Sequence, residues 1–215
     1  MLKDYLSHNL VYKKNNDWSD GKYDFYRDWQ WFIENSNLKN DAVILELGCG
    51  ASPYLRNFTQ FSKKYLGIDI SQKAIDKAKA RNQNNPDNEF LCQNFITDWK
   101  NERKFDLIID SFFLHCIIDG DRKIAIKKIV NSLIADGELW VNTMCNPPKT
   151  HDLLKSYNPK TKCMEIESKF VKISVRQFES PETIRKLIEF YGLSLVKEKV
   201  LSDEIQDNYL AIFKK

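Results

Sequence analysis

From residue 42 onward, the chain alternates short apolar runs with longer stretches of helical spacing. Ala42–Leu47 is apolar apart from Glu46, and residues 105–110 contain a second wholly apolar core, as expected for parallel strands buried on both faces. The stretch that follows Ser71 instead repeats its apolar residues at helical spacing. Such alternation is typical of βαβ units, so the pattern predicts an α/β fold with a parallel sheet.

The same reading gives the order of the predicted elements. The expected strands are 42–47, 65–69, 89–92, 105–110 and 138–143, with a half-exposed strand around Val171, Ile173 and Val175 and a closing hairpin of 193–200 and 209–213. The expected helices are 22–35, one from Pro53 with Ser52 as its cap, one capped by Ser71, 121–134, and a last one between Ser180-Pro181 and Gly192.

Composition narrows the class of protein. The chain has 215 residues, of which 42% are hydrophobic and 29% charged, and this balance predicts one globular unit. No run reaches the roughly 18 to 20 apolar residues of a membrane span, and the first residues lack the apolar core of a secretion signal. We therefore expect a cytoplasmic protein without a membrane partner.

The cysteine and charge patterns argue against a metal-binding protein and give no sign of a nucleic-acid-binding one. The five cysteines are widely spaced, without a Cys-x-x-Cys pair or matching histidines, which favours reduced thiols and predicts no metal site. The net charge is +3, from 33 basic and 30 acidic residues that are interspersed. A nucleic-acid partner is therefore not indicated.

A glycine turn follows the first strand and opens into a predicted helix. Backbone bared by Gly48 and Gly50 lets a ligand approach closely, and Cys49 lies between them. Pro53 stands where a dinucleotide-binding motif needs glycine, and Glu46 would repel phosphate but could organise a cationic amino acid moiety. S-adenosylmethionine (SAM), which carries a free amine and no phosphate, fits this turn better than a dinucleotide does.

Polar residues end the next strands. Asp69 lies 19 residues after Gly50, where a carboxylate can accept both hydrogens of a ribose diol. Asn94 could meet an adenine by its amide edge, and Phe95 by its ring or backbone. The expected cofactor-binding residues are Glu46, Gly48, Cys49, Gly50, Asp69, Ile70, Asn94, Phe95, Asp110 and Ser111.

Four motifs in order, residues 43–50, 66–71, 105–110 and 133–139, resemble those of class I SAM-dependent methyltransferases. The resemblance covers roughly residues 40–215. It implies a Rossmann-like, doubly wound, mostly parallel seven-stranded sheet with an antiparallel last strand, with the glycine turn holding the methionine part of SAM and Asp69 the ribose. Ser52 stands where many members carry a third glycine, and Asn94 where an Asp commonly reads the adenine.

The acceptor side is less specific in sequence. His115, just beyond the fourth strand, is the candidate general base, and the alternative is that it packs at a helix start. Tyr12 and Trp18 are candidate lid residues, and Arg176 lies near the acceptor in the inserted strand. Cys49, Cys116 and Cys145 follow the first, fourth and fifth strands, so they either share a crevice that suits a soft acceptor or simply pack in the core.

These residues predict a particular organisation. Residues 1–40 form an aromatic arm and helix that act as a lid, 41–215 form the SAM-binding domain, and 144–179 are an acceptor-side insert. The hypothesis is methyl transfer from SAM to a small-molecule acceptor. Transfer to a protein side chain, a SAM-binding protein without turnover, and a nicotinamide-dependent dehydrogenase, which Pro53 and Glu46 disfavour, are the alternatives. The acceptor atom and the oligomeric state leave no mark in the sequence.

Overall fold

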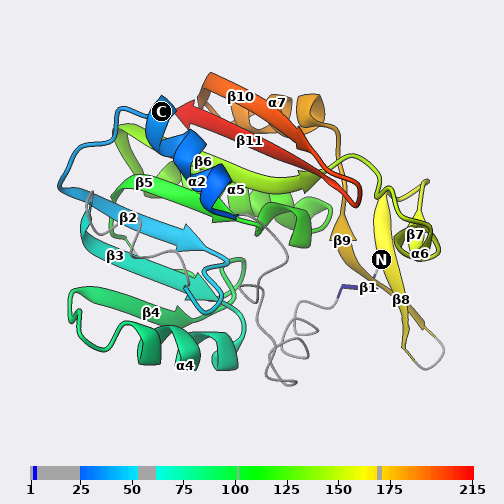
Figure 1. Cartoon of the computed structure of the whole chain (residues 1–215), viewed down its shortest axis with the longest axis horizontal. Helices are drawn as coiled ribbons and strands as arrows, with labels where there is room; N and C mark the ends of the chain where they lie inside the picture. The colour runs from blue at the N-terminus through cyan, green and yellow to red at the C-terminus, as the bar shows by residue number, and fades with distance from the viewer. Residues whose placement is uncertain (1, 4–24, 53–61, 101, 169–170) are drawn as a thin grey trace.

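The computed structural model describes residues 2–3, 25–52, 62–100, 102–168 and 171–215, and these form two sheets (Figure 1). The larger sheet has seven strands in the order β10-β11-β6-β5-β2-β3-β4, and the smaller has four in the order β1-β9-β8-β7. Strands β4, β3, β2, β5 and β6 run parallel, whereas β11 is antiparallel to both of its neighbours. The predicted fold class is thereby confirmed.

The elements of the larger sheet and its helices agree with the sequence pattern in order and type. The strands are β2 (Ala42–Leu47), β3 (Ser62–Asp69), β4 (Asn88–Cys92), β5 (Phe105–Ser111), β6 (Leu133–Cys145), β10 (Ser194–Ser202) and β11 (Asp207–Lys214). The helices are α2 (Phe25–Asn35), α4 (Gln72–Arg81), α5 (Gly120–Ser132) and α7 (Pro181–Phe190). The helix predicted from Pro53 lies outside the described residues.

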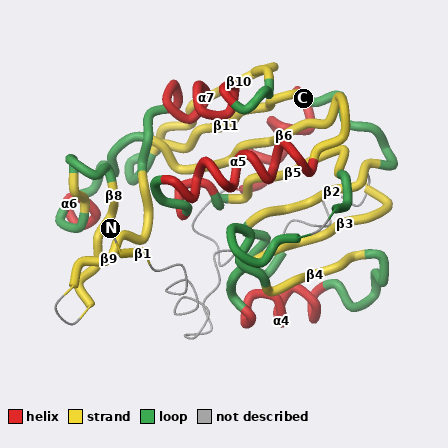
Figure 2. The backbone as a smooth tube through the Cα atoms, turned by 180° about the vertical axis from the view of Figure 1, so that it is seen from behind, coloured by secondary structure: helices red, strands yellow, loops and turns green. Residues whose placement is uncertain are grey.

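Helices cover both faces of the sheet (Figures 1 and 2). Apolar residues of α2 and α4 share one buried cluster with Ile44 and Leu107 of the sheet. Those of α5 and α7 share the other cluster with Leu45 and Ile108. Neighbouring strand residues therefore point to opposite cores, which explains the consecutive apolar residues of the central strands, 42–45 in β2 and 107–109 in β5.

Helix α2 is fixed to the sheet by aromatic packing. The ring of Phe32 is stacked on that of Trp140, with centroids 5.1 Å apart and planes 7° apart, and Trp29 lies 5.7 Å from Phe32. Both side chains of the helix are almost wholly buried. The side chains that recur at helical spacing along α2 therefore pack in the core.

No helix among the described residues is long and apolar enough to cross a bilayer.

The N-terminal ends of the helices agree with the sequence signals more closely than the C-terminal end of α5 does. Ser71 and Ser180 cap α4 and α7, each accepting the backbone N–H three residues on, from Ala74 and Thr183. Helix α5, predicted to reach Ile134, ends at Ser132. Leu133 already pairs with Phe105, so that β6 begins earlier than expected.

The insert is larger than its one predicted strand. It contains α6 (His151–Leu154), β7 (Tyr157–Asn158), β8 (Cys163–Ser168) and β9 (Val171–Gln177). The short strand β1 (Leu2–Lys3) pairs with β9 in parallel, with Leu2 opposite Ile173. Both views place this small sheet beyond the carboxyl ends of the parallel strands (Figures 1 and 2).

Candidate functional site

The glycine turn lies tightly between β3 and β5. The N–H groups of Gly48 and Cys49 both donate to the carbonyl of Ile68, at 2.9 and 3.1 Å. Gly48 has φ +73°, and a Cβ added there would lie 2.8 Å from the carbonyl oxygen of Ser111. Gly50 also has a positive φ of +53°. The turn thus has no room for a side chain at Gly48, favours glycine at Gly50, and leaves bare backbone at the end of β2, as a SAM-binding turn needs.

Asp69 ties this turn to the start of α4. Its Oδ2 accepts the N–H of Gly50 at 3.0 Å, and its Oδ1 accepts the N–H of Ser71 at 2.8 Å. Burial raises the pKa of this carboxyl, and backbone hydrogen bonds from Ser71, Gly50 and Ile70 oppose that rise. Because the two carboxylate oxygens have four lone pairs together, the group retains capacity for a ribose hydroxyl.

Glu46 is buried beneath the turn and is held by groups that sequence reasoning missed. The Tyr65 hydroxyl donates to Glu46 Oε2, and Ser52 Oγ lies 3.3 Å from the same hydroxyl. Burial raises the pKa of Glu46 to about 7, although hydrogen bonds from Tyr65 and Ser111 lower it. The only sequence signal for Tyr65 was a polar tip in an otherwise apolar strand.

The residues expected near the adenine divide into two groups. Asn94 accepts the Ile96 N–H with its Oδ1 at 2.9 Å, so its amide oxygen is engaged within its own loop. The Phe95 ring is buried against Trp99, 5.5 Å between centroids, which leaves only its backbone for contact. Ile70 is half-buried at the end of β3.

Asp110 accepts backbone N–H groups of the segment that follows β5. Its Oδ1 accepts the N–H groups of Phe113 at 2.7 Å and Leu114 at 3.0 Å. It therefore shapes the short 3₁₀ helix η2 (Leu114–Cys116) that carries His115. Burial raises the pKa of Asp110 to about 7, and Oδ2 has no hydrogen-bond partner among the described residues.

His115 is buried between the large sheet and the insert. Its ring is nearly parallel to that of Phe178, with centroids 6.4 Å apart and planes 25° apart, and Phe112 meets it edge-on at 6.0 Å. Tyr157 of β7 contacts Phe178 in turn, at 6.2 Å. Since Gly48 packs against Ser111 and the Phe113 Cβ, this aromatic cluster lies close to the glycine turn.

The remaining acceptor-side candidates are the three cysteines, Arg176, Tyr12 and Trp18, and the structure does not bring the three cysteines to one place. Burial raises the pKa of Cys116 to about 11, and the positive charge of Arg176 on β9 is the strongest influence opposing that rise. Cys49 instead lies against Gly67, and the pKa of Cys145 is raised to about 12 by burial near Asp207. The structure thus gives the three thiols different neighbours. Tyr12 and Trp18 lie outside the described residues.

Helix α2 contributes a buried carboxylate that the sequence did not single out. Asp28 is fully buried, and Asn142 of β6 donates its amide Nδ2 to Asp28 Oδ2 at 3.1 Å. Asn142 is the register partner of Ser111 on β5, so β5 is the strand between this contact and β2, which the glycine turn follows.

Among the described residues, no group of three or more His, Cys, Asp or Glu side chains is placed to hold a metal ion.

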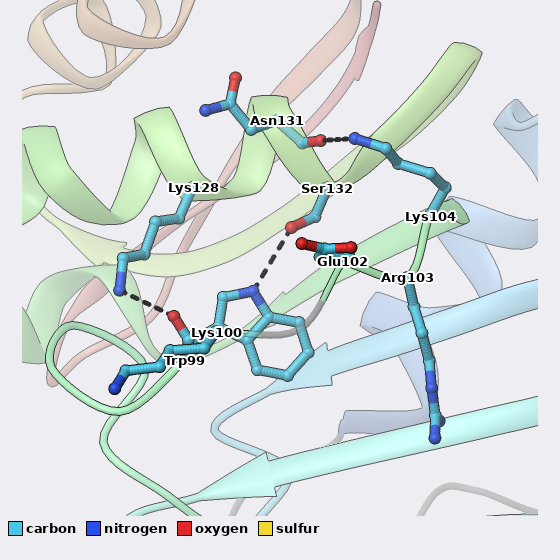
Figure 3. A pocket seen from close by; sticks show the side chains of 8 residues that line it. All are labelled: Trp99, Lys100, Glu102, Arg103, Lys104, Lys128, Asn131 and Ser132. Atoms are coloured by element: carbon cyan, nitrogen blue, oxygen red, sulfur yellow. Dashed lines mark hydrogen bonds between the residues drawn. The ribbon is translucent and has the colours of Figure 1, made fainter.

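A separate pocket lies at the opposite edge of the sheet, where β5 begins and α5 ends (Figure 3). Three of its cationic side chains bond to other groups of the protein. Lys104 donates to the Asn131 carbonyl at 2.5 Å, Lys128 donates to three carbonyls of residues 95–99, and Arg103 pairs with Glu89 at 2.7 Å. We interpret Lys104 and Lys128 as caps for backbone carbonyls and Arg103 as a partner of a surface carboxylate. The lining residues are Trp99, Lys100, Glu102, Arg103, Lys104, Lys128, Asn131 and Ser132.

Comparisons with known proteins agree with this geometry. Residues 45–139 match the family model described as methyltransferase domain. An uncharacterized methyltransferase of Staphylococcus carnosus is 26% identical over 200 residues, which cover 89% of this chain and 88% of that protein. A carboxy-S-adenosyl-L-methionine synthase of Helicobacter pylori is 29% identical over 109 residues, 49% of this chain and 44% of the synthase, so the chain spans less than half of that relative.

Solved structures show the same fold. The 1,6-didemethyltoxoflavin-N1-methyltransferase of Burkholderia thailandensis, solved with that compound and S-adenosylhomocysteine, has a TM-score of 0.71 at 14% identity. The superposition covers 100% of this chain and 92% of that one. The domain match, the shared fold and the glycine turn that ends β2 agree. The chain therefore resembles the class I SAM-dependent methyltransferases in its matched domain, residues 45–139, and in its fold.

Proposed function

We propose that this protein transfers a methyl group from SAM to a small-molecule acceptor bound beside His115. The observation that carries the proposal is the aromatic cluster of Phe112, His115, Phe178 and Tyr157, which is built jointly by the large sheet and the insert. It supports a compact acceptor site next to the glycine turn. The 1,6-didemethyltoxoflavin-N1-methyltransferase of the same fold, solved with bound 1,6-didemethyltoxoflavin, supports it further.

The donor side of the proposal uses the carboxyl ends of β2, β3 and β5. When bound, SAM supplies an electrophilic methyl group on its sulfonium. Bare backbone at Gly48, Cys49 and Gly50 would approach its methionine part, with Glu46 beneath. Asp69 would accept the ribose hydroxyls. The other residues proposed to border it are Ile70, Asn94, the backbone of Phe95, Asp110 and Ser111.

The acceptor side of the proposal follows from the chemistry of methyl transfer. Charge at the sulfonium is lost as the methyl group leaves, so walls of low polarity that exclude water favour the transition state. The rings of Phe112 and Phe178 supply such walls beside His115. Arg176, whose charge acts on Cys116, would favour an acceptor with an anionic group.

The division into segments remains part of the proposal. Residues 144–179 would border the acceptor, as the contact between Phe178 and His115 supports. Of residues 1–40, those that precede α2 would close over it, with Tyr12 and Trp18 in that lid, because α2 itself packs on the sheet through Phe32. Neither aromatic residue is among those whose structure is described.

Two binding measurements and one transfer measurement test the proposed function. We expect calorimetry to detect binding of both SAM and its demethylated product. Asp69→Ala should weaken SAM binding at least tenfold, whereas Asp76→Ala, on the exposed side of α4, should leave it unchanged. Methyl-labelled SAM is then incubated with the protein and with separated small-molecule and protein fractions of a cell extract.

Each outcome of this experiment has a defined meaning. Label in the small-molecule fraction supports the proposal, and label in the protein fraction alone would replace it with protein side-chain methylation. SAM binding without transfer to either fraction would instead indicate a SAM-binding scaffold. Absence of SAM binding would refute all three.

A further inference from the structure

Thr143 of β6 holds His115 through two contacts to one oxygen. The backbone N–H of His115 donates to Thr143 Oγ1 at 3.0 Å, and the His115 ring Nδ1 lies 3.2 Å from the same oxygen. Thr143 is 1% exposed and His115 is 3% exposed. The hydroxyl therefore has to place its proton inside the protein.

Only one arrangement of protons satisfies this contact. Thr143 Oγ1 already accepts the backbone N–H of His115, and among the described residues its own proton has no acceptor other than His115 Nδ1. If Nδ1 carried a proton, the buried hydroxyl would lose its acceptor, which is unfavourable for a donor shielded from water. The hydroxyl thus donates to Nδ1, and neutral His115 carries its proton on Nε2.

The contacts of the other ring nitrogen, Nε2, are consistent with a proton on that atom. His115 Nε2 lies 3.4 Å from Cys116 Sγ, and Cys116 Sγ lies 3.6 Å from the carbonyl oxygen of Phe112. Burial keeps the pKa of Cys116 at about 11, so its thiol retains a proton that it can donate to Phe112. In this arrangement the Thr143 hydroxyl donates to His115 Nδ1, His115 Nε2–H donates to Cys116 Sγ, and the Cys116 thiol donates to the Phe112 carbonyl.

We infer that Thr143 is a positioning residue that fixes His115 as an Nε2–H hydrogen-bond donor, and that the protein therefore takes acceptors that are already nucleophilic without a general base. The sequence predicted His115 as that base. In the inferred tautomer, its basic nitrogen is instead turned to Thr143, away from Cys116.

The class of acceptor follows, and this step rests on the proposed function. A group whose lone pair is free near neutral pH, such as a thiolate, a carboxylate, an acidic phenolate or an unprotonated amine, needs no base on the enzyme. Its lone pair forms the bond to the methyl carbon, and the carbon–sulfur bond breaks with its electrons left on the donor sulfur. Any surplus proton on a methylated amine is lost to water, so none passes to His115.

Nuclear magnetic resonance of the protein alone tests the tautomer. Histidine labelled with ¹⁵N in the ring is incorporated, and two-bond ¹H–¹⁵N correlations are recorded at neutral pH. Three histidines contribute signals, and the set missing in His115→Gln belongs to His115. We expect the protonated nitrogen of this set to couple to both ring C–H protons, which identifies it as Nε2.

Variants of Thr143 test the cause. Thr143→Val keeps the shape but removes the hydroxyl, so the His115 signals should shift toward a mixture of tautomers or the imidazolium. Thr143→Ser restores a hydroxyl and should restore the pattern, and it also serves if the valine variant does not fold. A protonated Nδ1 in the unsubstituted protein, or an unchanged spectrum in Thr143→Val, would overturn the inference.

These spectra are independent of the proposed function because they need neither SAM nor an acceptor. Failure to detect methyl transfer would leave the tautomer result intact. Conversely, a transfer-competent protein with a protonated Nδ1 at His115 would retain the proposed function and lose this inference.

Discussion

Glu46→Gln offers a quantitative test of how burial beneath the glycine turn affects stability. Glu46 is 2% exposed, and its pKa is raised from 4.5 to about 7, chiefly by burial. Because the folded protein holds this proton more tightly than the unfolded chain does, the group's contribution is fully present below pH about 4.5 and is lost as pH rises through about 7.

The magnitude follows from that difference. At about 1.4 kcal/mol per pH unit, a pKa raised from 4.5 to about 7 corresponds to about 3 kcal/mol lost between these values. Glutamine cannot ionise, yet its Oε1 can still accept the Tyr65 hydroxyl. The free energy of unfolding of Glu46→Gln relative to the unsubstituted protein should therefore rise by up to about 3 kcal/mol between pH 5 and pH 8.

Urea denaturation at a series of pH values measures this difference directly. Subtracting the unsubstituted curve removes other groups that titrate in the same range, including Asp110 with its pKa of about 7. Glu34→Gln on the exposed surface of α2 is the matched control for the removal of one carboxylate. A pH-independent difference for Glu46→Gln would refute the reasoning. The same variant should bind SAM more weakly at pH 8, because it lacks the carboxylate proposed to organise the amine.

Three further substitutions have defined outcomes. Phe32→Ala, which removes the ring stacked on Trp140, should lower the free energy of unfolding by about 3–5 kcal/mol in urea titrations, and a loss under 1 kcal/mol would contradict the packing. Gly48→Ala should abolish SAM binding in calorimetry, because its Cβ would meet the Ser111 carbonyl at 2.8 Å; unchanged affinity would show that the turn can open. His115→Gln, whose amide can donate where Nε2–H does, should keep kcat within roughly tenfold while His115→Ala loses more; equal losses in kinetic assays would favour a general base.

The sequence by itself determined the elements whose signals are local. Short apolar runs marked the central parallel strands, and Ser71 and Ser180 marked the helix starts that they cap. Positive φ at Gly48 and Gly50 accounts for the glycine turn, and Asp69 was found from its spacing. Each of these features depends on residues close in the chain, so the pattern alone was sufficient.

Tertiary structure decided the contacts that join distant segments. Strand β1 pairs with β9 across some 170 residues, and two residues leave no periodic signal by which such a partner could be found. The Phe95 ring turned into the core, so its expected ligand contact narrowed to its backbone.

The protonation of the site was likewise invisible to the sequence. Tyr65 reaches Glu46 across neighbouring strands, and Thr143 reaches His115 over 28 positions. Residue type shows that a histidine can accept or donate a proton, but only the partner of each ring nitrogen selects between these roles. The sequence therefore determined the fold and the donor turn, because those signals are local, whereas the chemistry of the acceptor side depends on long-range hydrogen bonds that only the packed structure supplies.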